Sequence, residues 1–159
     1  MVLDTYLNTS YRPECELIDG ELPERNVGEF DHSRLLTLLG ASLVVPEKHS
    51  GITTAIAPRV RVKSARIRVP DLIAVTELPT GPIVTNPPFL CIEVVSPRDR
   101  MTEILERVDD YLSFGVRYVW LIQSDTRRAF VYTSGDMHEA KDGVLSTENP
   151  EIRVALAEL

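Results

Sequence analysis

The chain has 159 residues, of which 43% are hydrophobic and 26% are charged, and its formal net charge at pH 7 is −7. This length predicts one domain, residues 1–159, with a substantial buried core. The composition is typical of a soluble globular protein, and no stretch is long and apolar enough to span a membrane. The acidic charge argues against a protein that coats nucleic acid without specificity.

The N-terminal residues and the cysteines predict a cytoplasmic protein. Residues 1–14 contain neither a basic start nor an apolar core, so they do not resemble a secretory signal. Cys15 and Cys91 are far apart and form no Cys-x-x-Cys pair, which is typical of free thiols in a reducing compartment. No zinc-ligand spacing joins either cysteine to the three histidines, His32, His49 and His138.

Charge is distributed unevenly along the chain. Residues 1–31 carry a net charge of −6 and residues 136–159 a net charge of −4, whereas residues 32–135 carry +3. Five bases and no acid lie within residues 58–70, namely Arg59, Arg61, Lys63, Arg66 and Arg68. This basic run predicts either a surface that contacts a polyanion such as nucleic acid, or an exposed edge strand that charge protects from aggregation.

The N-terminal part of the chain predicts a hairpin and then a helix. Residues 14–25 read as a short hairpin whose turn is Asp19-Gly20. Residues 28–45 contain leucines at helical spacing, which predicts an amphipathic helix. We expect Gly28 or Asp31 to cap this helix and Pro46 to end it.

The middle of the chain predicts strands. Residues 52–57 are a strand candidate, and basic and apolar residues then alternate from 59 to 63. The alternation changes phase at Ser64-Ala65, which indicates a bulge or a bend before Arg66. Residues 72–76 and 89–95 are almost continuously apolar, as in strands that are covered on both faces.

The C-terminal part predicts a βαβ unit. Residues 99–114 carry an apolar stripe at helical spacing, and Gly115 is a natural C-cap. Residues 116–122 form a further apolar run, so the strands before and after the helix are expected to be parallel. Residues 129–133 predict an antiparallel hairpin partner, and residues 136–159 a mixed tail with short strands near Val144 and at 152–154.

Two acidic residues stand out because of where they lie. Asp71 directly precedes the apolar run 72–76, and Glu93 lies inside the run 89–95. A buried carboxylate is costly unless it is paired, protonated or bound to a metal ion. If the two strands are neighbours, both carboxylates can converge on one hard divalent cation. The alternative is a purely structural acid, whose carboxylate accepts hydrogen bonds from backbone amides or from an arginine.

With their flanking motifs, these acids resemble a nuclease pattern. A strand ending in Pro-Asp, a loop and a strand carrying Glu-x-x are similar to the PD-(D/E)XK motif. The wider match is carried, in order, by ECELIDGEL, GEFDHSRLL, RVRVKSARIRVPDLIAV, PPFLCIEVVSPRDR and VDDYLSFGVRYVWLI. Over nearly the whole chain, these segments resemble the Uma-type family of proposed restriction endonucleases. The resemblance implies a restriction-endonuclease-like α/β fold, with a mixed β-sheet and a central βαβ unit flanked by two main helices.

The resemblance also implies a metal site. Asp71 and Glu93 would hold magnesium, with manganese as a substitute, and the carbonyl of the residue after Glu93 would complete the shell. Glu16 and His32 match family positions near the same site.

Arg107 is the point at which this chain departs from the family pattern. The superfamily places a lysine two residues after the glutamate, where this chain has Val95, and the Uma-type family places one on the following helix, where it has Arg107. An arginine cannot act as a general base, although it can stabilise a phosphate or orient a water. The alternative is a surface arginine that pairs with Glu103 or Asp110.

Three functions are compatible with these residues. The first is a metal-dependent endonuclease that hydrolyses DNA, with the basic run 59–68 on the DNA backbone and a homodimer supplying two sites for two strands. The second is a nuclease-fold module that binds DNA or protein without catalysis. The third is a glycosidase with Asp71 and Glu93 as acid and base, which the low aromatic content of 6% disfavours.

Overall fold

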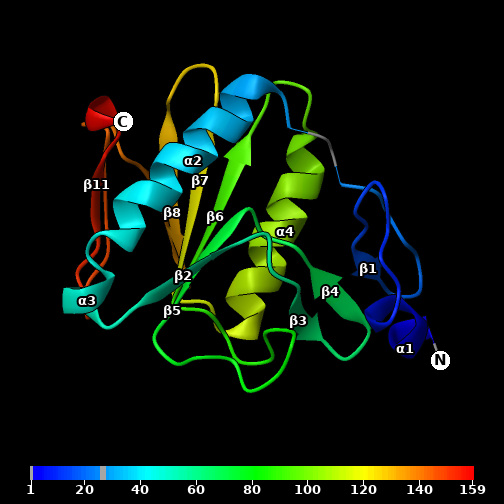
Figure 1. The fold of residues 1–159 in the computed structure, drawn as a ribbon. Coiled ribbons are helices and arrows are strands. Elements are labelled where there is room, and N and C mark those ends of the chain that lie inside the picture. Colours follow the sequence, from blue (N-terminus) through cyan, green and yellow to red (C-terminus); the bar gives the residue numbers. More distant parts are fainter. Residues whose placement is uncertain (1, 26–27) are drawn as a thin grey trace.

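The computed structural model describes residues 2–25 and 28–159 and is built around a mixed β-sheet (Figure 1). In spatial order the sheet contains β2 (Thr53–Ile56), β5 (Leu72–Val75), β6 (Leu90–Val95), β7 (Tyr118–Gln123), β8 (Ala129–Thr133) and β9 (Asp136–Glu139). β6 and β7 are parallel, and the other neighbouring pairs are antiparallel. Because α4 (Met101–Phe114) connects β6 to β7, the predicted βαβ unit is confirmed.

Two helices cover the sheet on opposite faces. Alternate residues of β5 and β6 pack with α2 (Phe30–Val44), namely Leu72, Ala74, Leu90, Ile92 and Val94 against Leu35, Leu39 and Leu43. The intervening residues pack with α4, namely Ile73, Val75, Cys91 and Val95 against Ile104, Val108 and Tyr111. Burying one such aliphatic side chain stabilises the fold by about 1.5–3 kcal/mol. Asp71 and Glu93 share the second alternation, so both are placed on the α4 side of the sheet.

The predicted helix ends are partly correct. Gly115 caps α4 with a φ of 113°, and its N–H donates to the carbonyls of Tyr111 and Leu112, as expected. For α2 the expectation was wrong, because the cap position is Glu29 rather than Gly28 or Asp31. Acidic side chains near a helix start are favoured by the helix dipole even when they are not the cap, which explains the misplaced prediction.

A second, smaller sheet lies beside the first one, at the N-terminal side in Figure 1. Its strands are β1 (Leu17–Ile18), β4 (Arg66–Arg68) and β3 (Val60–Lys63). The predicted hairpin is confirmed, since Ile18 and Glu21 exchange backbone hydrogen bonds of 2.9 and 3.0 Å. Asp19 and Gly20 have φ values of 51° and 95°, which is the two-residue turn that matches strand twist.

The basic run forms a hairpin rather than one irregular strand. The chain reverses at Ser64-Ala65, so that β3 and β4 pair antiparallel, with a bulge between Arg61 and Lys63. A single change of phase in the alternation of basic and apolar residues cannot distinguish a bulge from a turn. Both features change which side chains lie on the same face. Four of the five basic residues therefore lie on two paired strands, and Arg59 directly precedes the first of them.

Several short elements were not expected from the sequence. They are α1 (Val2–Leu7), α3 (Glu47–Ser50), the strand β9 and the helix η1 (Leu156–Glu158). Elements this short carry too few residues to show a hydrophobic period. The expected tail strands are present as β10 (Val144–Ser146) and β11 (Arg153–Ala155), which pair antiparallel and extend the core under α2.

Two further expectations concern cysteines and membranes. Cys15 and Cys91 are both free, as predicted, and both are buried. Within residues 2–25 and 28–159, none of the helices is long and apolar enough to cross a membrane.

Candidate active site

Asp71 and Glu93 come together at the carboxyl end of β6. The antiparallel register pairs Leu72 with Ile92, and continuing it by one residue places Asp71 level with Glu93. Both side chains are almost completely buried, each residue being 5% exposed. They line a cavity of about 320 Å³ whose wall also includes Arg25, Glu29, His32, Arg98, Arg100, Glu103 and Arg107. The sequence analysis required the strands that carry the two acids to be neighbours, and β5 and β6 are adjacent.

Asp71 is held as an anion by three donors. Its Oδ1 accepts a hydrogen bond from Arg25 Nη2 at 2.7 Å. Its Oδ2 accepts one from the Val94 N–H at 2.8 Å and lies 3.3 Å from His32 Nε2. Burial alone would raise the pKa of Asp71, but the His32 hydrogen bond and the Arg25 charge outweigh it and lower the pKa. The same contact raises the pKa of His32, which favours the protonated ring.

Glu93 has the opposite electrostatic character. Burial, followed by the nearby negative charge of Asp71, raises the pKa of Glu93 to about 8. Its Oε1 accepts a hydrogen bond of 2.6 Å from the Tyr111 hydroxyl and lies 3.8 Å from Arg107 Nη1. One ionised carboxylate beside one that holds its proton is the arrangement expected when two buried acids lie close together, because two negative charges would repel each other there.

Glu16 fixes Arg107 beside Glu93. Glu16 Oε1 accepts hydrogen bonds from Arg107 Nη1 at 2.9 Å and from the Val69 N–H at 2.8 Å. Burial would lower the pKa of Arg107, but the carboxylates of Glu93 and Glu16 raise it, so the guanidinium stays charged. The alternative of a surface arginine bound to Glu103 or Asp110 is wrong, because Arg107 is only 20% exposed and its ion pairs are with Glu16 and Glu93.

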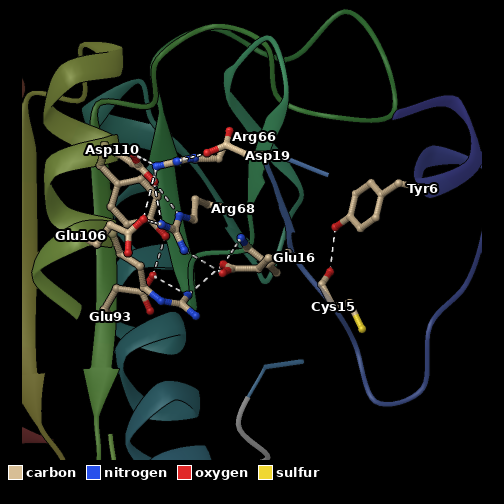
Figure 2. A network of polar contacts seen from close by, with 12 residues as sticks. Tyr6, Cys15, Glu16, Asp19, Arg66, Arg68, Glu93, Glu106 and Asp110 are labelled. Carbon is tan, nitrogen blue, oxygen red and sulfur yellow. Dashed lines mark hydrogen bonds and ion pairs between the residues drawn. The ribbon is translucent and has the colours of Figure 1, made fainter. Parts of the chain in front are cut away.

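Much of the basic run is neutralised inside the protein. Arg68 is buried and forms ion pairs with Glu16 at 3.1 Å and with Asp110 at 2.7 Å. Arg66 binds Asp110 at 2.9 Å and also pairs with Asp19. Figure 2 shows this network, in which Arg68 points toward both Glu16 and Asp110.

The other three bases of the run differ in exposure. Arg59 donates to backbone carbonyls at the end of α1 and lies over the Tyr6 ring, 4.6 Å from its centroid. Arg61 donates to the Ser64 carbonyl, and Lys63 keeps 54% of its side chain exposed. A role of the run in binding nucleic acid stays a prediction. Lys63 also pairs with Asp110, at 3.6 Å, but exposure favours Arg61 and Lys63 for this role over Arg66 and Arg68, whose side chains are buried or nearly so.

The chemistry of the donor set fits magnesium or manganese. In the part of the chain that the structure describes, no group of three or more His, Cys, Asp or Glu side chains gathers as a metal site. The carboxylates of the cavity wall that are buried side by side are Asp71 and Glu93, so backbone oxygens and water would supply the other ligands. Magnesium typically uses one or two carboxylates and keeps several waters, for which the cavity has room.

Three residues of this site and of the arginine network beside it were missed by the sequence analysis. Arg25 and Asp110 lie among many surface charges of the sequence, and nothing local indicates that Arg25 is partly buried against Asp71 or that Asp110 is buried beside Arg66 and Arg68. Tyr111 was assigned to the apolar stripe of α4, where its ring does lie, but its hydroxyl reaches Glu93. The helical spacing of Arg107 and Tyr111, four residues apart, could have placed both on the Glu93 side.

The arrangement of this sheet, its two helices and the acids at the strand ends defines the class of protein. The chain has the restriction-endonuclease-like α/β fold. Its structure superposes with a TM-score of 0.82 on a crystal structure from Anabaena variabilis ATCC 29413, described as "a putative nuclease belonging to DUF820". The similarity covers 99% of this chain and 96% of the other, at 19% sequence identity, and it shows a shared fold.

The family follows from the sequence match. Residues 4–158 match the Uma2 family, described as "Putative restriction endonuclease", and the chain belongs to that family. No match was found among the curated proteins.

Proposed function

We propose that this protein is a metal-dependent endonuclease that hydrolyses phosphodiester bonds in DNA. The observation that carries the proposal is the pair of buried carboxylates, Asp71 and Glu93, level with each other on adjacent strands in a cavity that arginines line. Membership of the Uma2 family and the nuclease-like fold of its structural neighbour support the same reading.

Asp71 and Glu93 would hold the metal ion. When bound, magnesium or manganese lowers the pKa of a coordinated water and neutralises charge on the scissile phosphate. Glu93 must release its proton to serve as a ligand, and a divalent cation favours that release. Tyr111 then orients the Glu93 carboxylate through the hydrogen bond to Oε1.

Arg107 would contact the phosphate. Its charge is fixed by Glu16 and faces the cavity next to Glu93. Since a guanidinium does not release a proton near neutral pH, Arg107 stabilises negative charge and is not the base. In the part of the cavity wall that the described residues form there is no lysine, and the histidine that can exchange a proton there is His32.

A module without catalysis is the second candidate. Two observations favour it, namely the arginine at the position of the family lysine and the Arg25 guanidinium on Asp71. A glycosidase is disfavoured, because among the described residues that line the cavity there is no Phe, Tyr or Trp on which a sugar ring could stack.

The test is a cleavage assay on single-stranded and double-stranded DNA, and on RNA, with magnesium or manganese and with a chelator. We expect metal-dependent cleavage of DNA by the wild-type protein and a loss of at least about 100-fold in Glu93→Gln. Glu103→Gln is the matched control, since Glu103 is an exposed glutamate on the rim of the same cavity.

The outcome separates the two candidates. No metal-dependent cleavage of any substrate, with retained binding in a mobility-shift assay, would favour the non-catalytic module. Cleavage that is equal in Glu93→Gln and in the wild-type protein would place the chemistry elsewhere. A homodimer is expected if both strands are cut, and sedimentation of the protein with a DNA duplex measures it.

A further inference from the structure

Arg25 is a cation that lies inside the candidate metal site. It belongs to the end of the N-terminal hairpin, where its backbone N–H donates to the Glu14 carbonyl at 2.8 Å. From there its side chain crosses to Asp71, 46 positions further along the chain, and is only 17% exposed. Glu93 and Arg107 are close enough to act on its charge. A partly buried guanidinium therefore lies where a divalent cation would be bound.

The two oxygens of Asp71 have different partners. Oδ2 accepts from the Val94 N–H and lies near His32, so both of its lone pairs are directed at protein groups. Among the residues that the structure describes, Arg25 is the one that donates to Oδ1. Oδ1 is thus the oxygen that offers a lone pair to a metal ion.

A divalent cation on Oδ1 conflicts with Arg25 at its present position. Two positive centres on one carboxylate oxygen would repel each other more strongly beside this buried carboxylate than in bulk water. Charge-assisted hydrogen bonds to a partly buried carboxylate are also among the stronger ones, so the Arg25 contact has to be broken at a cost. Arg107 does not meet the same conflict, because its direct hydrogen bond is to Glu16.

We infer that Arg25 is the cation of the metal-free site, which occupies Asp71 Oδ1 and is displaced from it when a divalent cation binds. Arg25 therefore lowers the metal affinity of the free protein and stabilises Asp71 until the metal arrives. This inference rests on the proposed metal-binding function and adds a residue to it.

The experiment is a calorimetric titration of Mn²⁺ alone into the wild-type protein and into Arg25→Gln and Arg25→Lys. We expect Arg25→Gln to bind Mn²⁺ about tenfold more tightly, which is the change that losing one charge-assisted competitor produces. We expect Arg25→Lys to fall between the two, because lysine keeps the charge but not the fork geometry. It also serves as the second variant if Arg25→Gln does not fold.

Two controls separate the role of Arg25 from a general charge effect. Arg98→Gln removes an arginine of the same cavity wall that is 84% exposed and bound to Glu29 rather than to Asp71, and we expect its Mn²⁺ affinity to change less than twofold. The double variant Arg25→Gln with Asp71→Asn should not show the tighter Mn²⁺ binding that we expect for Arg25→Gln alone. Melting temperatures with and without Mn²⁺ give a second readout, with a larger metal-induced rise in Arg25→Gln.

The possible results are distinct. Unchanged or weaker Mn²⁺ binding in both Arg25 variants overturns the inference, and so does the absence of Mn²⁺ binding in all of them. Tighter binding in the Arg25 variants without cleavage of any nucleic acid by the wild-type protein supports the inference while the proposed endonuclease activity fails. An equal gain in Arg98→Gln would reduce the effect to overall charge and overturn the specific role of Arg25.

Discussion

Arg107 Nη1 donates a hydrogen bond to Glu16 Oε1 at 2.9 Å, although the two residues are 91 positions apart. This contact joins the N-terminal hairpin to α4 and keeps a permanent positive charge 3.8 Å from Glu93 Oε1. Glu16 also accepts a hydrogen bond from the Arg68 guanidinium (Figure 2). One buried carboxylate therefore holds two arginine side chains in place. The first two predictions concern these charges.

Exchanging Arg107 separates charge from proton transfer. Since the guanidinium acts as a fixed charge, Arg107→Lys should change the cleavage rate less than about tenfold, whereas Arg107→Ala should lower it at least about 100-fold. Rates are measured with saturating Mn²⁺ at a temperature where each variant is folded. An acceleration of about 100- to 10,000-fold in Arg107→Lys would show instead that this position needs a base.

Replacing Arg68 by alanine should lower the free energy of unfolding far more than replacing Arg61. Arg68→Ala leaves the buried carboxylates of Glu16 and Asp110 without their shared cation, so the free energy of unfolding should fall by about 3–5 kcal/mol. Arg61 is half-buried and its guanidinium donates to the Ser64 carbonyl, so Arg61→Ala should cost less than about 1 kcal/mol. Urea unfolding measures the free energy of unfolding of both variants. A similar loss in Arg68→Ala and Arg61→Ala would contradict the role given to the buried ion pairs of Arg68.

Glu93 makes stability depend on pH. In the unfolded chain its carboxyl ionises near pH 4.5, whereas in the folded protein burial and Asp71 raise the pKa to about 8. The unfolded state therefore binds fewer protons between these values, and the wild-type free energy of unfolding should fall with rising pH, by at most about 1.4 kcal/mol per pH unit. Glu93→Gln lacks this proton, so its stability relative to wild type should rise from pH 5 to pH 8.

The measurement is urea unfolding in a chelator, so that no divalent cation contributes. Glu103→Gln is the control, because that glutamate is exposed and its substitution should leave the pH dependence unchanged. Parallel stability curves for the wild-type protein and Glu93→Gln would refute the raised pKa.

His32 reports on the Asp71 contact. The hydrogen bond to Asp71 raises the pKa of His32 in the folded protein, so the stability it contributes is complete below about pH 6.5 and disappears as the pH rises through the folded value. An NMR titration of the His32 ring should give a pKa above the ordinary value, and Asp71→Asn should lower it. A ring that titrates identically in both proteins would mean that the contact is absent in solution.

Local patterns in the sequence predicted most of the main helices and strands correctly. The hairpin turn at Asp19-Gly20 requires residues that tolerate positive φ, and the βαβ unit over 89–122 follows from two apolar runs around an amphipathic helix. Which residues of one strand share a face is also local, because side chains alternate with a period of two, but the register that sets Asp71 level with Glu93 is a property of the tertiary structure. Whether these acids bind metal and cut DNA stays a prediction.

The tertiary structure alone decided which charges meet. The sequence of the basic run is equally compatible with an exposed nucleic-acid surface, yet the turn at Ser64-Ala65 brings Arg66 and Arg68 to Asp110 and Glu16. The Arg25–Asp71 contact is likewise set by how the N-terminal hairpin docks on the end of β5. Ion pairs between distant segments depend on packing geometry and burial, and neither quantity is encoded in the spacing of the charged residues themselves.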